Sequence, residues 1–155
     1  MEKGNLEGEI KESFYASVEE IGHKRGVFKS SSGNTITDYY DIRAVCLRRP
    51  GVVRSYVMCV LADIEEDYDA VACIGAGGAI LLGLLAPLGV KGYLYNPKGY
   101  GRVWSPEPPS VGERLVLLDD VITTGSTLQS LEQAVSEGTD AVVVWKGALY
   151  DRGNG

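Results

Sequence analysis

The feature of the sequence that most restricts its fold is an alternation of short apolar runs with helical patterns in the second half. AVACIG, GYLY, RLVLLD and AVVVW each read as a short strand, and helical stretches follow the first and the third. Strands without a polar face are buried on both sides, which is typical of a parallel sheet. We therefore expect an α/β fold, with one parallel sheet flanked by helices and strands at 70–75, 92–95, 114–119 and 141–145.

The first third of the chain reads as a helix followed by a loop that enters a strand or hairpin. Residues 26–43 change from small polar residues to β-formers, and Pro50 stands just before a helical pattern that runs to about Ile64. His23, the single histidine, is expected on a loop with no catalytic task. The first helix is predicted from apolar residues recurring every three or four positions before Gly22: Leu6, Ile10, Phe14, Val18 and Ile21.

Charge and cysteine usage exclude several classes of function. The net charge of −6 argues against a nucleic-acid or anionic membrane partner, because such binders need basic faces. No apolar run is long enough to span a membrane, and the first residues lack the apolar core of a signal peptide. Cys46, Cys59 and Cys73 lie in apolar surroundings without a CxxC pair, so we expect buried thiols in a reducing cytoplasm.

The string VLLDDVITTGST, residues 116–127, combines two adjacent acids with a hydroxyl-rich turn before a helix. Backbone N–H groups at a helix N-terminus, joined by Ser and Thr hydroxyls, form an anion site of the size of one phosphate. Asp119 and Asp120 would repel a phosphate but can accept hydrogen bonds from the hydroxyls of a ribose. A sugar 5-phosphate explains both halves of the string. The alternative is a helix with an ordinary Ser or Thr cap, preceded by solvated acids.

A second unusual turn, GAGG at residues 75–78, follows the first apolar strand. It lacks the third glycine of the dinucleotide-binding pattern, since Ile80 stands there, and the chain contains no P-loop. Ligands of open α/β sheets bind beyond the carboxyl ends of the strands, and both turns fall at that edge.

The string VLLDDVITTGST resembles the motif that binds phosphoribosyl diphosphate (PRPP) in type I phosphoribosyltransferases. Three further segments resemble orotate phosphoribosyltransferases: residues 28–43, PKGYG at 97–101 and LYDRGNG at 149–155. GAGG resembles the pyrophosphate-binding turn of type I phosphoribosyltransferases, and all the segments stand in the family's order. The resemblance runs from about residue 22 to the end. It implies the type I fold with a small N-terminal hood. We expect a single domain, with a hood at about 1–45, a core at about 50–155 and a mobile catalytic loop at 96–113.

The resemblance also implies a role for each motif. PRPP and orotate would be the substrates, with Mg²⁺ bridging diphosphate and ribose oxygens and Asp119 and Asp120 as candidate metal ligands. Lys98 would act as a catalytic residue together with both acids, and it would come from the loop of the partner subunit in a homodimer. The remaining implied residues are Gly75, Ala76, Gly77, Gly78, Thr123, Thr124, Gly125, Ser126 and Thr127 for PRPP, with the two acids, and Tyr39, Tyr40 and Arg152 for the base.

The implied reaction forms orotidine 5′-monophosphate and diphosphate, a step of pyrimidine biosynthesis. Two positions depart from the family, since Leu94 and Tyr95 stand where an Arg-Lys pair is usual, and Lys91 or Arg102 would then have to supply the charge. Two other functions remain open: a phosphoribosyltransferase for another base, and a non-catalytic regulator that binds PRPP.

Overall fold

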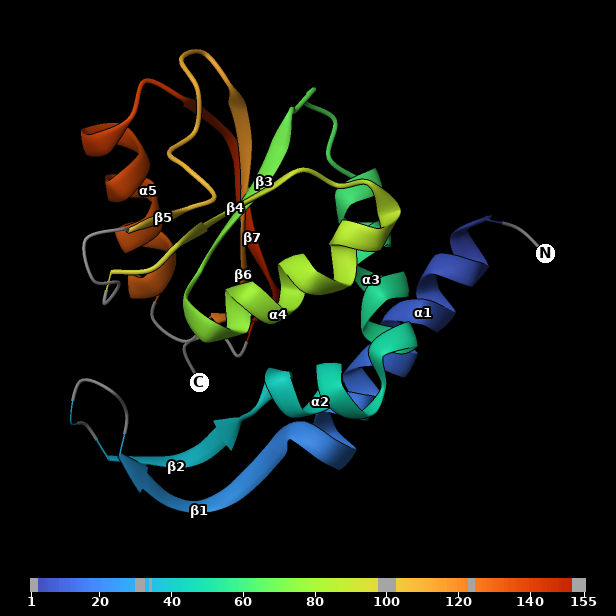
Figure 1. Ribbon diagram of the computed structural model, residues 1–155. Helices are drawn as coiled ribbons and strands as arrows, with labels where there is room; N and C mark the ends of the chain where they lie inside the picture. The colour runs from blue at the N-terminus through green and yellow to red at the C-terminus, as the bar shows by residue number, and fades with distance from the viewer. Residues whose placement is uncertain (1–2, 30–32, 34, 98–102, 123–124, 152–155) are drawn as a thin grey trace. The chain divides into compact units, whose positions relative to one another are not determined.

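The computed structural model describes most of the chain as two compact units, Met1–Cys59 and Val60–Gly155 (Figure 1). Each unit is described by itself. The boundaries of a hood near residue 45 and of a core from about residue 50 stay a prediction. The described residues are 3–29, 33, 35–97, 103–122 and 125–151.

The first unit contains helices and one antiparallel hairpin. The expected first helix ends as an α-helix at Ser17, and a π-helical turn continues it to Gly22. A Cβ atom at Gly22 would lie 2.9 Å from the carbonyl oxygen of Asp41. The expected hairpin is present, but His23 is the first residue of a strand and not part of a loop. The elements are α1 (Lys3–Ser17), a π-helical turn η1 (Val18–Gly22), β1 (His23–Lys29), β2 (Thr35–Tyr40), α2 (Ile42–Arg48) and the start of α3 (Pro50–Ala62).

The short helix α2 was not expected, because Asp41 and Ile42 read as the end of a strand. The carboxylate of Asp41 accepts a hydrogen bond of 3.1 Å from the backbone N–H of Ala44 and so caps the helix. Phe14 and Tyr56 stack with their ring centroids 4.4 Å apart, which joins α1 to α3 within the core of this unit.

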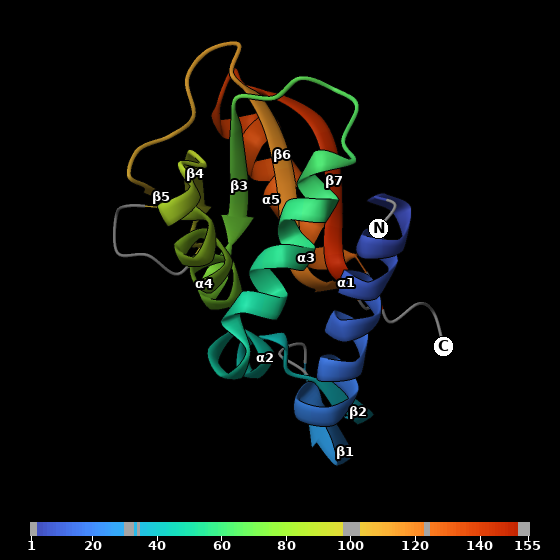
Figure 2. The same ribbon diagram turned by 90° about the vertical axis from the view of Figure 1, so that its right-hand side faces the viewer.

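The second unit is built on a five-stranded sheet of order β5-β4-β3-β6-β7. All neighbouring pairs are parallel except β4 with the two-residue strand β5. Figure 2 shows β3, β6 and β7 side by side. The predicted α/β class, with a parallel sheet, is confirmed. The strands are β3 (Ala70–Ile74), β4 (Gly92–Tyr95), β5 (Trp104–Ser105), β6 (Arg114–Ile122) and β7 (Val142–Asp151).

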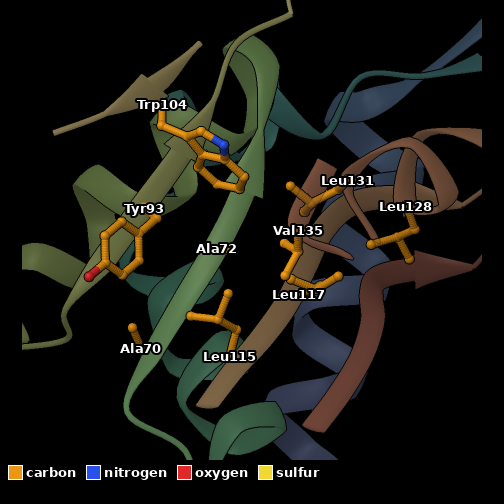
Figure 3. Packing of buried hydrophobic residues seen from close by; sticks show 9 residues of the cluster. All are labelled: Ala70, Ala72, Tyr93, Trp104, Leu115, Leu117, Leu128, Leu131 and Val135. Atoms are coloured by element: carbon orange, nitrogen blue, oxygen red, sulfur yellow. The ribbon is translucent and has the colours of Figure 1, made fainter. Parts of the chain in front are cut away.

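Helices cover both faces of this sheet. α4 (Gly75–Leu85), continued by the 3-10 turn η2 (Ala86–Leu88), lies on one face, and α5 (Ser126–Gly138) lies on the other (Figure 1). Leu128, Leu131 and Val135 recur on one side of α5 and are buried against the sheet, where Figure 3 shows them facing side chains of β3 and β6. Among the described residues, no helix combines the length and apolar character needed to cross a membrane.

Several boundaries of the second unit differ from those expected, and β7 continues past the expected end at residue 145 to Asp151. β6 extends through both acids to Ile122, because its backbone pairs with β7 as far as Asp151 whatever the polarity of the side chains. The GAGG turn is the first turn of α4 and not a loop. β5 lies inside residues 96–113, where no regular element was expected. It forms because β4 offers a partner, and the N–H of Asn96 also donates to the carbonyl of Val103 at 2.6 Å.

Candidate functional site

Both unusual turns meet at one edge of the sheet, as the sequence predicts. β3 and β6 are parallel neighbours with Ala72 opposite Leu117, so α4 and the turn before α5 begin at the same carboxyl edge. A Cβ atom built at Gly77 would lie 2.5 Å from Oδ2 of Asp120. The carboxylate of Asp120 therefore touches the first turn of α4.

Asp119 is the most enclosed acid of this edge, with only 5% of its surface exposed. Its Oδ1 atom accepts a hydrogen bond of 2.8 Å from the backbone N–H of Asp120. Burial raises the pKa of Asp119 well above its usual range, and the adjacent carboxylate of Asp120 raises it further. An acid in this environment is the opposite of the solvated acid that the alternative interpretation required.

Asp120 is half-buried and its carboxylate is held on two sides. Oδ1 accepts the backbone N–H of Val121 at 2.9 Å, while Oδ2 points at Gly77. The two acids thus present oxygens at adjacent positions of β6, one enclosed and one partly open.

The N-terminus of α4 has no side-chain cap. Ile74 is the N-cap residue in an extended conformation, and Gly75 has φ of +73°, a left-handed conformation that favours glycine. Gly78 lets the helix approach β3, because a Cβ atom there would be 2.7 Å from Cβ of Cys73. The result is a helix N-terminus whose free N–H groups face the carboxyl edge, which is the physical basis of anion binding.

At the N-terminus of α5, the described N-cap residue provides no side-chain cap. This residue is Gly125, with φ of +83°, and the exposed residues Ser126 and Thr127 form the start of the helix. The described residues do not favour the alternative interpretation, since the N-cap residue is a glycine and Asp119 is buried. Thr123 and Thr124 lie outside the described residues.

A cavity of about 400 Å³ opens beside this second helix start. It lies between Ile74 and Tyr95, at the carboxyl ends of β3 and β4, and one side of α5 from Thr127 to Glu137. The hydroxyl-bearing first turn of α5 is therefore open to a ligand from this side.

Lys91 does not supply the missing positive charge, and this expectation is wrong. It stands at the amino end of β4, where Nζ lies 2.8 Å from Oε2 of the buried Glu113. In the described part of the second unit the other cations are Arg114, which pairs with Asp69, and Lys146, which pairs with Glu132. Lys98, Arg102 and Arg152 lie outside the described residues.

Tyr95 occupies one of the positions where the family usually has a cation. Its ring packs on Trp104 at a centroid distance of 5.0 Å, and Leu94 beside it is half-buried. The described residues at the carboxyl edge of the second unit thus offer carboxylates and helix ends, and no cationic side chain.

The two tyrosines expected to bind the base lie on β2 in the first unit. The hydroxyl of Tyr39 accepts a 3.3 Å hydrogen bond from Arg43, and the ring of Tyr40 stacks on His23 at 4.4 Å. Nδ1 of His23 is in turn 2.8 Å from Oε2 of Glu19. The contact between His23 and Tyr40 was not anticipated, because the histidine was expected on a loop.

Cys73 is the residue of this edge that the sequence identified only as a buried thiol. That prediction is confirmed for Cys73 and Cys46 and is wrong for Cys59, which is partly exposed. Burial raises the pKa of the Cys73 thiol, and the neighbouring charges of Asp119 and Asp120 act in the same direction. Its place directly beneath Gly78 and the acid pair could not be read from the AVACIG run.

The described residues do not form a metal site made of protein ligands alone. Among the described residues, no three His, Cys, Asp or Glu side chains are grouped so that they could hold a metal ion. Asp119 and Asp120 offer the hard carboxylate oxygens that Mg²⁺ prefers, but the remaining ligands would have to come from water or substrate oxygens.

The chain is similar to known proteins over most of its length, although no family model matches it. The orotate phosphoribosyltransferase of Rhodopirellula baltica is 31% identical over 153 residues, which cover 88% of this chain and 78% of that protein. The orotate phosphoribosyltransferase of Pelotomaculum thermopropionicum is 31% identical over 137 residues, covering 84% and 69%. Among solved structures, the orotate phosphoribosyltransferase from Aeropyrum pernix matches with a TM-score of 0.66 and 25% identity, covering 94% of this chain and 83% of that one. By this similarity of sequence and fold, the chain belongs to the orotate phosphoribosyltransferase family.

Proposed function

We propose that the protein transfers the 5-phosphoribosyl group of PRPP to orotate, which forms orotidine 5′-monophosphate and diphosphate in pyrimidine biosynthesis. Membership of the family supports this reaction. The observation that carries it is that Asp119 and Asp120 lie at one sheet edge with two helix N-termini, whose described N-cap residues, Ile74 and Gly125, provide no side-chain cap.

PRPP would use each part of this edge. The hydroxyls of the ribose would donate to the oxygens of Asp119 and Asp120. The turn Gly125–Thr127, with Thr123 and Thr124, would bind the 5-phosphate through backbone N–H groups and hydroxyls. The first turn of α4, Gly75 to Gly78, would offer its N–H groups to the diphosphate.

Magnesium fits this arrangement because the described residues at the carboxyl edge of the second unit include acids and no cation. A diphosphate brought beside two carboxylates needs positive charge, and Mg²⁺ supplies it through oxygen ligands. Asp119 and Asp120 are the residues of the chain that would contribute such ligands.

In the reaction, the bond from C1 of the ribose to the diphosphate oxygen breaks, and a ring nitrogen of orotate forms a bond to C1. Negative charge grows on the diphosphate, where Lys98 of the partner subunit in a homodimer and the N–H groups of α4 would stabilise it. Closure of the part of the predicted loop that lies between β4 and β5 and carries Lys98 would exclude water, which otherwise hydrolyses PRPP. Tyr39, Tyr40 and Arg152 would hold orotate, whose acidic nitrogen needs no strong protein base.

The chain would act in the cytoplasm, as its three free cysteines support. A non-catalytic regulator that binds PRPP is the second candidate, and Leu94 and Tyr95 at the usual Arg-Lys positions favour it. A phosphoribosyltransferase for another base is the third.

One assay separates these candidates. The absorbance of orotate is followed with PRPP and Mg²⁺ together and with each omitted, and diphosphate release is measured with a panel of bases. We expect orotate to be consumed only in the complete mixture, and Lys98→Ala to lower the rate strongly. Tight binding of PRPP without diphosphate release for any base would instead establish the regulator, and release with a different base alone would identify another acceptor.

A further inference from the structure

The carboxylate of Asp120 occupies the space that a side chain at position 77 would need. A Cβ atom at Gly77 would lie 2.5 Å from Oδ2 and 3.0 Å from Cγ of Asp120, whereas the next nearest atom, Oδ1, is 3.6 Å away. Real Cβ atoms essentially never approach another atom below 3.0 Å. Among the described residues, an alanine at position 77 would thus clash with the carboxylate of Asp120, which supplies all three of the nearest atoms.

The backbone at Gly77 gives no reason for a glycine. Its φ angle is outside the left-handed region, and the residue lies in the first turn of α4, where alanine is the better helix former. Its neighbours in the GAGG turn have other reasons: Gly75 has a positive φ, and Gly78 packs on Cys73. For Gly77, the close contact that a side chain would disturb is the one with Asp120.

The carboxylate of Asp120 cannot rotate away without loss. Oδ1 accepts the N–H of Val121 at 2.9 Å while Oδ2 points at Gly77. A methyl group at position 77 would require Oδ2 to move, and with it the orientation in which the carboxylate is held beside Val121.

We infer that Gly77 is a positioning residue for sugar recognition, because its missing side chain sets the orientation in which Asp120 meets the hydroxyls of a ribose phosphate. This inference depends on the proposed function, in which Asp120 accepts hydrogen bonds from the ribose. It assigns to Gly77 a task on the sugar, in addition to the backbone N–H that the turn would offer to the diphosphate.

The test compares the sugar selectivity of Gly77→Ala with that of a matched variant. Gly83→Ala lies in the same helix, where a Cβ atom would meet nothing within 4 Å. Calorimetry measures the dissociation constants of ribose 5-phosphate and of its 2,3-dideoxy analogue, which keeps the phosphate and lacks both hydroxyls. We expect the wild type and Gly83→Ala to prefer ribose 5-phosphate by roughly tenfold to a hundredfold, the range of hydrogen bonds to a charged group. Gly77→Ala should lose most of this preference and keep its affinity for the analogue.

The outcomes separate the inference from the function on which it depends. If Gly77→Ala keeps the full preference of the wild type, the inference is overturned and the proposed function stands. If the wild type has no preference for the hydroxyl-bearing sugar, the assignment of the acids in the proposed function fails, and the inference fails with it.

A second measurement covers the case in which Gly77→Ala does not fold. The close contact is with the carboxylate, so any loss of stability that Gly77→Ala causes in the wild type should be largely absent in an Asp120→Ala background. Equal losses of melting temperature in both backgrounds would show that the space at Gly77 serves something other than Asp120, which contradicts the inference.

Discussion

The hydroxyl of Tyr93 donates a 2.6 Å hydrogen bond to the carboxylate of Glu113, and both residues are buried at the amino ends of β4 and β6. Glu113 also accepts from the backbone N–H of Ser110 and pairs with Lys91. Burial alone would raise the pKa of Glu113, but its hydrogen bonds with Lys91, Tyr93 and Ser110 outweigh burial and lower it. This edge of the sheet is thus a satisfied polar network, distinct from the carboxyl edge that carries the candidate site.

Tyr93→Phe removes one donor from this network. We expect the free energy of unfolding to fall by about 1–2 kcal/mol, because a buried acceptor loses a partner. Urea titration measures the change. The affinity for PRPP should equal that of the wild type, and a parallel loss of affinity would contradict the separation of the two edges.

Asp69→Asn should reduce the loss of stability that the protein shows at low pH. Hydrogen bonds from the side chain and backbone N–H of Arg114 lower the pKa of Asp69 from 3.8 to about 2. A lowered pKa in the folded state contributes stability above the unfolded pKa, and this contribution is lost as the pH falls toward 2. Melting temperatures between pH 5 and pH 2 should fall more steeply for the wild type than for Asp69→Asn, and parallel curves would contradict the expectation.

Asp119→Asn should make the stability of the protein less dependent on pH and should weaken the binding of ribose 5-phosphate. Because the folded state raises the pKa of Asp119, the wild type loses stability as the pH rises from the unfolded value near 4 toward the folded one. Asparagine does not titrate, so in metal-free buffer the variant should lose less melting temperature between pH 5 and pH 9. Its affinity for ribose 5-phosphate should be lower by roughly tenfold or more. A variant with unchanged affinity would remove Asp119 from the site.

Gly78→Ala should destabilise the second unit. Its Cβ atom would lie 2.7 Å from Cβ and 3.1 Å from the backbone carbon of Cys73, so α4 must move away from β3. Overpacking of this kind costs about 1–3 kcal/mol. Chemical denaturation should show this loss, whereas Gly83→Ala, with open space around it, should gain up to about 1 kcal/mol.

Tyr95→Lys restores a cation where the family usually has one. We expect tighter binding of inorganic diphosphate and a faster orotate reaction, together with a modest loss of stability because the ring of Tyr95 leaves Trp104. Steady-state kinetics and thermal melting measure the two effects. Tyr95→Gln, of similar length without charge, is the control and should show the loss of stability alone.

The elements that depend on local pattern could be predicted from the sequence. α5 follows from the apolar spacing of Leu128, Leu131 and Val135, and β3 from the uninterrupted run at 70–74. Elements that depend on a distant partner could not. β5 exists through its pairing with β4, and the last residues of β6 exist through pairing with β7.

The candidate site shows the same division. Asp119 and Asp120 were found because the acids precede a hydroxyl-rich turn, a signal that is contiguous in the chain. The contact between Gly77 and Asp120 joins the first turn of α4 to β6. Nothing in the GAGG letters distinguishes a glycine that makes room for a carboxylate from one that makes room for a ligand. Only the packing of α4 against β6 shows which of these two roles the glycine has.

The hydrogen bond between Asn96 and Val103 joins the ends of β4 and β5, whatever residues stand between them. Because closing a longer loop costs only a little more entropy, replacing the intervening stretch should leave both strands in register. These two positions are therefore suitable splice points for chimeras, in which loops from other transferases are exchanged to alter turnover without redesigning the scaffold.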